Sequence, residues 1–241
     1  MIDTRYAHRG YHDKPQVPEN SIPAFERAIE RGWGAELDVH LTKDKKLVVI
    51  HDSDLVRLTG AQGTVEELSF DELRRFRLEG TDNMIPSFDE VLALFEEKTP
   101  LIIELKVYHG NYKELAKAVC ERLDTYKGDY CIESFDPRAI WEVRKLRPDT
   151  EIGQLSQDFT KGGEAEVAPW QRGLLTNLRF NFLSHPDFIA YKFEDRSNKA
   201  NRRCIKKGCK EVSWTIRSKE DMLDVERGGG IAIFECFDPD E

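Results

Sequence analysis

The chain has 241 residues, of which 45 are acidic and 36 basic, so its formal net charge is −9. This length suits one barrel domain or two smaller domains, and a hydrophobic fraction of 39% is enough for a sizeable core. The acidic balance argues against broad contact with nucleic-acid phosphates, and no apolar run approaches the roughly 18 residues that a membrane-spanning helix needs.

The first half of the chain alternates short apolar runs with amphipathic ones. Strands are expected over 6–8, 35–41 and 47–50, and helices over 20–31, 69–78 and 87–95. Asn20 or Ser21 can cap the first helix, whose apolar residues recur at helical spacing. In each of the other two helices a Ser is followed three residues later by Glu, the pattern of a capping box.

The second half continues the same alternation. Strands are expected over 101–107, 129–135, 151–155, 180–183, 211–216 and 231–237, and helices over 112–123, 137–146, 164–175, 198–207 and 219–226. Repeated β–α units imply a parallel sheet, and about eight units in this length favour a closed (β/α)8 TIM barrel of the α/β class. We expect one domain over 1–241, with a small insertion after the second strand. Few residues follow the last strand, so the last outer helix is expected to be short or missing.

Two expected strands carry charged residues two positions apart, Glu36 with Asp38 and Glu104 with Lys106. Alternate side chains of a barrel strand point inward, so each pair shares a face. Buried charges are costly unless they are paired, and the spacing allows two interpretations. The residues could form ion pairs, such as Glu104 with Lys106, or the three carboxylates could bind a metal. Carboxylates suit one divalent cation, Mg²⁺ or Ca²⁺, and Mn²⁺ less well.

Two histidines stand where expected strands end, His8 and His51. Active sites of barrel enzymes lie at the carboxyl ends of the strands, and imidazoles there can act as general acid and base. Arg9 and Lys106 could bind an anionic oxygen. A lone histidine is more often a structural hydrogen-bonding group, and we assign that role to His12, His40, His109 and His185. Two imidazoles, three carboxylates and two cations together fit phosphoryl chemistry.

Several ordered motifs resemble those of the glycerophosphodiester phosphodiesterase family. They are HRG at 8–10, PEN at 18–20, ELDV at 36–39, HDSDLVR at 51–57, IPS at 85–87, IIELK at 102–106, SFDP at 134–137 and SWTI at 213–216. The resemblance covers nearly the whole chain. It implies a (β/α)8 barrel, a divalent cation and hydrolysis of a small-molecule glycerophosphodiester to sn-glycerol 3-phosphate and an alcohol.

The resemblance also implies roles for individual residues. His8 and His51 match the catalytic pair, and Glu36, Asp38 and Glu104 match the metal ligands. One histidine would remove a proton from the attacking hydroxyl, which can be the substrate glycerol's own, and the other would protonate the departing alcohol. Water would then open the resulting cyclic phosphate.

Further positions match the substrate-binding parts of the family pattern. Arg9 and Lys106 match the phosphate contacts, and the PEN motif is expected to hold the His8 loop. Trp214 is expected to line the mouth where the substrate alcohol lies, or else to pack in the core.

The chain departs from the family pattern at four places. Residues 11–13 change the loop after HRG, Glu133 replaces a small polar residue, and Arg217 replaces an Asn. The usual glycine-aspartate turn and I-T-D strand are replaced by GGGIAIFECFDPD at 228–240. This last change leaves two alternatives to consider. One is lysophospholipase D-like action on lipid diesters, with the segment 170–188 as the only candidate for an apolar lip. The other is a barrel that binds a phosphodiester or a partner protein without catalysis, against which the retained His8 and His51 argue.

The cellular setting is inferred from signals that the sequence lacks. The amino terminus shows no basic start followed by an apolar run, so we expect no signal peptide. The five cysteines show no CxxC spacing and are typical of reduced thiols. We therefore expect a cytoplasmic protein with no nucleic-acid partner and no stable membrane insertion. The sequence does not indicate an oligomeric state.

Overall fold

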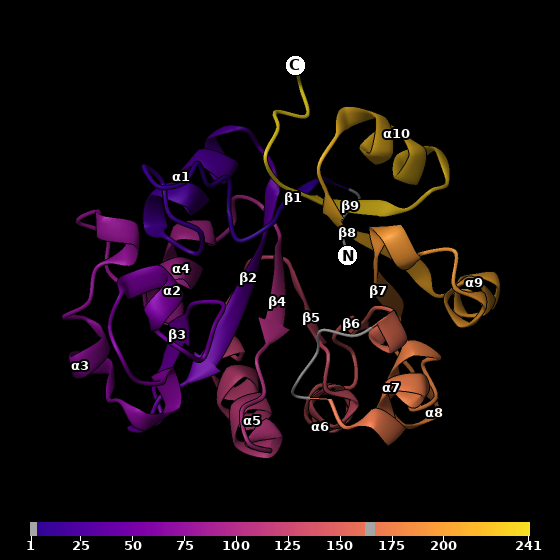
Figure 1. Cartoon of the computed structure of the whole chain (residues 1–241), viewed down its shortest axis with the longest axis horizontal. Helices are drawn as coiled ribbons and strands as arrows, with labels where there is room; N and C mark the ends of the chain where they lie inside the picture. The colour runs from indigo at the N-terminus through magenta and orange to yellow at the C-terminus, as the bar shows by residue number, and fades with distance from the viewer. Residues whose placement is uncertain (1–3, 162–166) are drawn as a thin grey trace.

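Eight parallel strands close into a barrel in the computed structural model, which describes residues 4–161 and 167–241 (Figure 1). Around the barrel they are β1 (Tyr6–Ala7), β2 (Gly34–Leu41), β4 (Leu101–Leu105), β5 (Tyr130–Ser134), β6 (Ile152–Ser156), β7 (Phe188–Lys192), β8 (Lys210–Ile216) and β9 (Ile231–Phe234). β1 pairs with both β2 and β9, and this double pairing closes the ring. The expected (β/α)8 barrel is therefore confirmed.

Helices surround the strands (Figure 1). They are α1 (Ile22–Glu30), α2 (Val56–Thr59), α3 (Phe70–Leu73), α4 (Phe88–Phe95), α5 (Tyr112–Leu123), α6 (Pro137–Leu146), α7 (Pro169–Thr176), α8 (Asn181–Ser184), α9 (Lys199–Lys206) and α10 (Lys219–Arg227). Both capping boxes are present, at Ser69 for α3 and Ser87 for α4. Within the described stretch 167–241 no helix follows β9, as the short tail predicts.

The expected insertion lies between β2 and α4. It contains β3 (Leu47–Val49), which runs antiparallel to β2 outside the barrel, followed by α2 and α3. Its buried apolar side chains form a cluster of their own: Val48, Ile50, Leu55, Leu58, Val65, Leu73, Leu78 and Ile85. The insertion thus brings its own core and leaves the closure of the barrel unchanged.

Three expected elements differ from the structure. The strand expected over 180–183 is wrong, since this segment lies in and beside α8, and the barrel strand follows at 188–192. A short apolar run does not distinguish a strand from a helix, and the Phe182 side chain is 67% exposed rather than buried in a sheet. The helix expected over 69–78 ends at Leu73. The helix expected over 164–175 is observed over 169–176, and residues 164–166 lie outside the described residues.

The barrel interior is apolar near the amino ends of the strands and charged near their carboxyl ends. Glycines make room for two buried rings in the apolar half. A Cβ atom added to Gly153 would lie 2.0 Å from the Phe188 ring, and one added to Gly34 would lie 2.6 Å from the Tyr6 ring. This packed floor supports the polar side chains above it.

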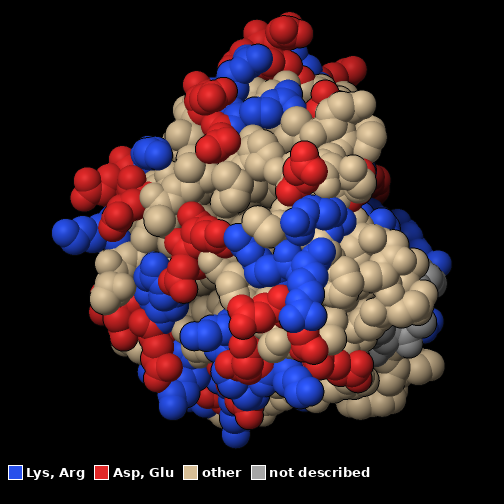
Figure 2. All heavy atoms as spheres, turned by 90° about the vertical axis from the view of Figure 1, so that its left-hand side faces the viewer, with Lys and Arg blue, Asp and Glu red and all other residues tan. Residues whose placement is uncertain are grey.

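Outside the barrel, charges of both signs intermingle. On the face seen in Figure 2, Lys and Arg side chains lie among Asp and Glu side chains. Within the described residues, no helix combines the length and the apolar character needed to cross a membrane.

The glycine at the barrel floor gives a direct test of this packing. Gly153→Ala should lower the free energy of unfolding by about 1–3 kcal/mol, because Phe188 has to move out of a close-packed interior. The measurement is urea unfolding followed by circular dichroism. The control is Gly173→Ala in α7, where no described atom lies within 4 Å of the added Cβ, and stability should be unchanged or raised by up to about 1 kcal/mol. Equal stabilities for the two variants would contradict the described packing.

Candidate active site

A polar cleft opens at the carboxyl ends of the strands. Its cavity volume is about 430 Å³. The lining residues are His8, Arg9, Lys14, Glu19, His51, Asp52, Arg57, Lys192, Glu194, Trp214, Thr215, Arg217 and Glu235. Both predicted catalytic histidines line it, with five Lys or Arg side chains. This density of cations suits an anionic ligand.

The HRG turn presents His8 and Arg9 to the cleft. The His8 N–H donates to the Phe234 carbonyl (2.8 Å), which ties the turn to β9. Arg9 and Gly10 both have left-handed backbone, with φ of 56° and 79°. At Gly10 a side chain would also meet Ala24 of α1 at 2.9 Å, so the close approach favours glycine. The Arg9 N–H then donates to Glu36 (3.1 Å), which links the turn to β2.

All three predicted metal ligands converge beneath this turn. Oxygens of Glu36, Asp38 and Glu104 lie within 4.8 Å of one another, and all three residues are buried. The β2–β4 pairing sets Asp38 directly beside Glu104. Burial and the neighbouring carboxylates raise the pKa of Glu36. Burial also raises the pKa of Glu104, with Lys106 opposing and Asp38 adding to the effect.

The cations beside this cluster only partly balance it. Lys106 Nζ lies 3.0 Å from Glu104 and 3.4 Å from Asp38, and Arg9 Nε lies 3.4 Å from Asp38. The Glu104–Lys106 ion pair, one of the two interpretations of the spacing, is thus present, and the three carboxylates of the other interpretation are clustered as well. Asp38 Oδ1 is buried and accepts no hydrogen bond from the described residues. Buried, mutually repelling oxygens with one left unsatisfied fit a hard divalent cation.

Glu133 adds a fourth buried carboxyl group from β5. It is paired in register with Glu104, and its Oε2 has no hydrogen-bond partner among the described residues. Burial raises its pKa well above the usual value, and the nearby Glu104 and Asp38 add to this. Glu133, which departs from the family pattern, thus adds a fourth carboxyl group beside the cluster, and its raised pKa favours the neutral, protonated form.

The PEN motif at 18–20 binds neighbouring cationic side chains and also fixes the HRG turn. Glu19 is fully buried and accepts hydrogen bonds from Arg9 (2.9 Å), Arg57 (2.7 Å) and Lys14. Burial alone would raise its pKa, but Arg57, Arg9 and Lys14 together hold it well below the usual range. The Asn20 side chain donates to Asp38 (2.8 Å) while its N–H donates to the Arg9 carbonyl (2.9 Å). The motif therefore positions Arg9 and Asp38 together.

His51 is held from two sides. Its Nδ1 lies 2.5 Å from Asp52 Oδ1, and Asp52 also bonds Arg57. His40 contacts Glu66 through Nδ1 (2.6 Å) and the His51 carbonyl through Nε2 (3.0 Å). His40 thus has the structural role expected of it. His109 and His185 do not line the cleft.

Glu235 is a site residue that sequence reasoning did not single out. It follows β9, and its Oε2 lies 2.6 Å from His8 Nδ1 while Oε1 accepts from Arg217 (2.7 and 2.9 Å). Burial alone would raise its pKa, but His12, His8 and Arg217 hold it well below the usual range. The available signal was the alternation of Ile231, Ile233 and Glu235, which places a carboxylate on the inward face of the last strand.

The contact with Glu235 sets the hydrogen-bonding state of His8. Burial and the nearby Arg9 lower the pKa of His8 to about 4, against the opposing effect of Glu235, so its imidazole is neutral at pH 7. A carboxylate accepts only, so Nδ1 carries the proton and Nε2 is an acceptor, 4.0 Å from Glu36. An unprotonated Nε2 beside the carboxylate cluster has the form of a general base.

Trp214 combines the two roles that were considered for it. Its indole N–H donates to the Ala190 carbonyl (3.1 Å), and its ring meets Phe135 edge to face at 5.5 Å. The half-buried ring also lines the cleft. It is therefore packed in place where it can contact a bound molecule.

The buried Glu19 gives a test of the cation network. Glu19→Gln removes the negative charge shared by three cations, so the free energy of unfolding at pH 7 should fall by about 2 kcal/mol. The pKa of Glu19 is lower in the folded protein than in the unfolded chain, where it is about 4.5, so its ionised form stabilises the fold above about pH 4.5. This stabilisation is lost as the pH falls and the carboxyl group becomes protonated. The difference between wild type and variant should therefore narrow below about pH 4.5 in urea unfolding. The exposed Glu30→Gln should change stability by less than about 0.5 kcal/mol. A difference in unfolding free energy between wild type and Glu19→Gln that does not change with pH would contradict the lowered pKa of Glu19.

Comparison with known proteins agrees with this geometry. The model of the glycerophosphoryl diester phosphodiesterase family matches residues 8–237. A glycerophosphodiester phosphodiesterase of Caldanaerobacter subterraneus is 34% identical, with 92% of this chain and 89% of the relative covered.

Solved structures show the same fold. A glycerophosphodiester phosphodiesterase from Thermotoga maritima superposes with a TM-score of 0.72 at 28% identity, covering 97% of this chain and 95% of that one. An Oleispira antarctica phosphodiesterase, solved in complex with the product sn-glycerol-3-phosphate, gives a TM-score of 0.79 at 22% identity, covering 96% and 92%. With the family match across nearly the whole chain, these findings show that the protein belongs to the glycerophosphoryl diester phosphodiesterase family and is a phosphoric diester hydrolase.

Proposed function

We propose that this protein hydrolyses glycerophosphodiesters to sn-glycerol 3-phosphate and an alcohol, using a divalent cation and a pair of histidines. The observation that carries the proposal is one cleft in which two carboxylate-backed histidines line the wall above a buried cluster of three carboxylates. The product complex of the Oleispira phosphodiesterase supports this class of substrate.

Glu36, Asp38 and Glu104 would hold the cation. Their all-oxygen donor set favours Mg²⁺ or Ca²⁺, and Mn²⁺ next. When bound, such an ion supplies positive charge to the phosphoryl oxygens. Arg9 and Lys106 stand beside the same carboxylates, where their cationic groups can bind a phosphate oxygen.

His8 and His51 would move the protons. His8 Nε2, unprotonated at neutral pH, would accept the proton of the attacking hydroxyl as its oxygen forms a bond to phosphorus. His51 would give a proton to the alcohol oxygen as its bond to phosphorus breaks. If the substrate's own hydroxyl attacks, the product is a cyclic phosphate, and a water molecule then opens it with the two roles exchanged. Glu235 and Asp52 hold the two rings in place for these transfers.

The lipid-diester alternative receives less support from the structure. The segment 170–188 does expose Trp170 and Phe182, at 70% and 67%. However, α8 carries Phe182 near the amino end of β6, because Arg144 donates to the Ser184 carbonyl and Asp187 accepts from the Ile152 N–H. That end is opposite the cleft. The candidate segment therefore does not form an apolar lip at the cleft as a unit, and we favour diesters with small alcohol groups.

The remaining expectations accompany this proposal. A single domain over 1–241, a cytoplasmic location, and the absence of nucleic-acid partners and of stable membrane insertion stay predictions. All five cysteines lie in the described residues as free thiols, which is compatible with a reducing compartment.

Metal dependence is tested on EDTA-treated protein. Release of sn-glycerol 3-phosphate from glycerophosphocholine and glycerophosphoethanolamine should be lost and then restored by Mg²⁺, Ca²⁺ or Mn²⁺, since the carboxylates alone repel an anionic diester. Lysophosphatidylcholine should be the poorer substrate. Unchanged turnover after metal removal would contradict the proposal, and preference for the lysolipid would favour the alternative.

The role of Glu235 has its own test. Glu235→Gln should lower kcat by about 10²–10⁴-fold, because an amide can donate to Nδ1 and leave the proton on Nε2. The protein should still bind the cation, which calorimetry can measure. The exposed Glu220→Gln in α10 should keep full activity. A wild-type kcat in the Glu235→Gln variant would contradict the proposed role of Glu235 in orienting His8.

A further inference from the structure

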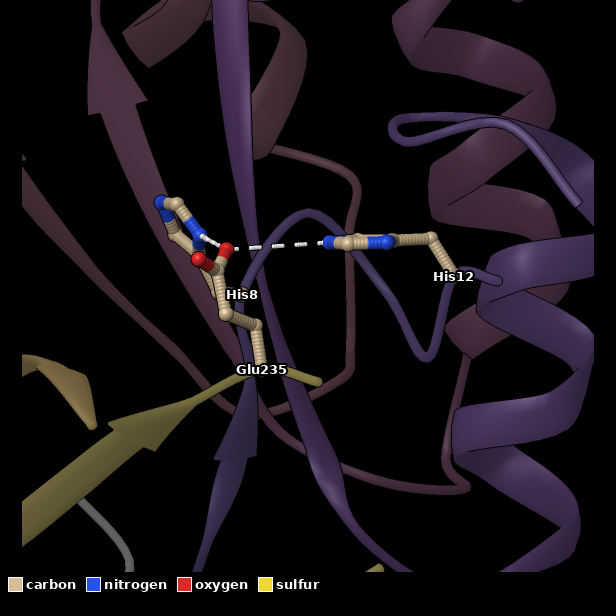
Figure 3. Close-up of side chains that lie close together, drawn as sticks. All are labelled: His8, His12 and Glu235. Carbon is tan, nitrogen blue, oxygen red and sulfur yellow. Dashed lines mark hydrogen bonds and ion pairs between the residues drawn. The ribbon is translucent and has the colours of Figure 1, made fainter. Parts of the chain in front are cut away.

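His12 faces the carboxylate that holds His8. Glu235 Oε2 lies 2.6 Å from His8 Nδ1 and 3.7 Å from His12 Nε2. Side-chain nitrogen and oxygen atoms of these three residues all lie within 4.8 Å of one another. Both imidazoles point at the carboxylate, His8 from the end of β1 and His12 from the loop that follows it (Figure 3). Two nitrogens and one oxygen therefore converge on one point, apart from the all-oxygen cluster of Glu36, Asp38 and Glu104.

His12 is the unexplained member of this group. Its side chain is only 6% exposed, yet Nε2 makes no hydrogen bond to any described residue, since 3.7 Å to Glu235 is too long. A buried nitrogen that reaches a carboxylate at ion-pair distance only, without a hydrogen bond, is costly and calls for an explanation. Nothing in the proposed hydrolysis uses it, and it does not line the cleft.

The donor set selects a different class of cation from the acidic cluster. Two imidazoles and one carboxylate suit Zn²⁺ and its neighbours Co²⁺, Ni²⁺ and Cu²⁺, whereas Mg²⁺ and Ca²⁺ prefer oxygen. Arg217 engages the other oxygen of Glu235, which leaves Oε2 aimed at the two rings. Because Arg217 also adds positive charge, we expect the site to bind more weakly than a structural zinc site.

We propose that His8, His12 and Glu235 form a second cation site, specific for Zn²⁺-like ions, whose occupation inhibits the enzyme. Two zinc ligands at about 2.0–2.1 Å in tetrahedral geometry stand about 3.3 Å apart. The His8–Glu235 contact therefore opens slightly and the His12–Glu235 contact closes slightly.

Inhibition would arise because the bound ion changes which nitrogen of His8 carries the hydrogen. This step rests on the proposed function, in which His8 is the general base. A metal on Nδ1 displaces the hydrogen there, and the neutral ring carries it on Nε2 instead, with no net release of a proton. His8 Nε2 then has no lone pair to accept the proton of the attacking hydroxyl. The ion thereby blocks the base without occupying the acidic cluster.

The test titrates Zn²⁺ into the full-length protein held in excess Mg²⁺, with release of sn-glycerol 3-phosphate from glycerophosphocholine as one readout. Wild type should lose activity in step with the binding of one Zn²⁺, measured by calorimetry. His12→Ala, measured against its own Mg²⁺-supported activity without Zn²⁺, should need about 10–100-fold more Zn²⁺ for half-inhibition than wild type. His109→Ala, outside this group, should behave as wild type. Equal inhibition of His12→Ala and wild type would overturn the proposal.

A second readout does not depend on turnover. Co²⁺ added in excess Mg²⁺ should give the visible absorption of a low-symmetry nitrogen-ligated ion in wild type, and His12→Ala should lose it while melting at the same temperature. Equal Co²⁺ spectra for wild type and His12→Ala would contradict the proposed cation site. Binding of Zn²⁺ to wild type without loss of activity would contradict the proposed inhibition. If the Mg²⁺-loaded wild type does not cleave glycerophosphodiesters, the proposed function fails, but the Co²⁺ spectra still decide whether the site exists.

Discussion

The burial of like charges inside the barrel is the constraint on which the rest of the structure depends. Glu36, Asp38 and Glu104 stand side by side on β2 and β4, with Glu133 next to them, in an interior where unpaired charge is costly. The surroundings reduce this cost through Lys106, Arg9 and Asn20. Burial and mutual repulsion still raise the pKa values of Glu36, Glu104 and Glu133, so this compensation is incomplete.

The histidines depend on a related arrangement at the rim. Each imidazole Nδ1 is held by a carboxylate, His8 by Glu235 and His51 by Asp52, and each carboxylate is itself paired with an arginine. Such second partners fix the orientation of a ring and decide which nitrogen carries the proton. Because Glu235 directly follows β9, closure of the barrel by β1 and β9 also completes the site.

The sequence predicted the elements and residues whose signals are local. Capping boxes, helical spacing and the inward alternation of Glu36 with Asp38 each depend on a few neighbouring residues, and the structure agrees with them. It did not predict α8, because a four-residue apolar run has no distinctive period. Nor did it predict that His12 would meet Glu235, since that contact joins positions 12 and 235 and exists only once the ring has closed.

The central claim is that the buried carboxylates are completed by a divalent cation. Thermal unfolding of the EDTA-treated protein, with and without added Mg²⁺ or Ca²⁺, tests it most directly. A cation bound only in the folded state stabilises that state by mass action, so Tm should rise with cation concentration in wild type and stay constant in Asp38→Asn. A Tm that does not respond to either ion in wild type, or one that rises equally in the variant, would contradict the account.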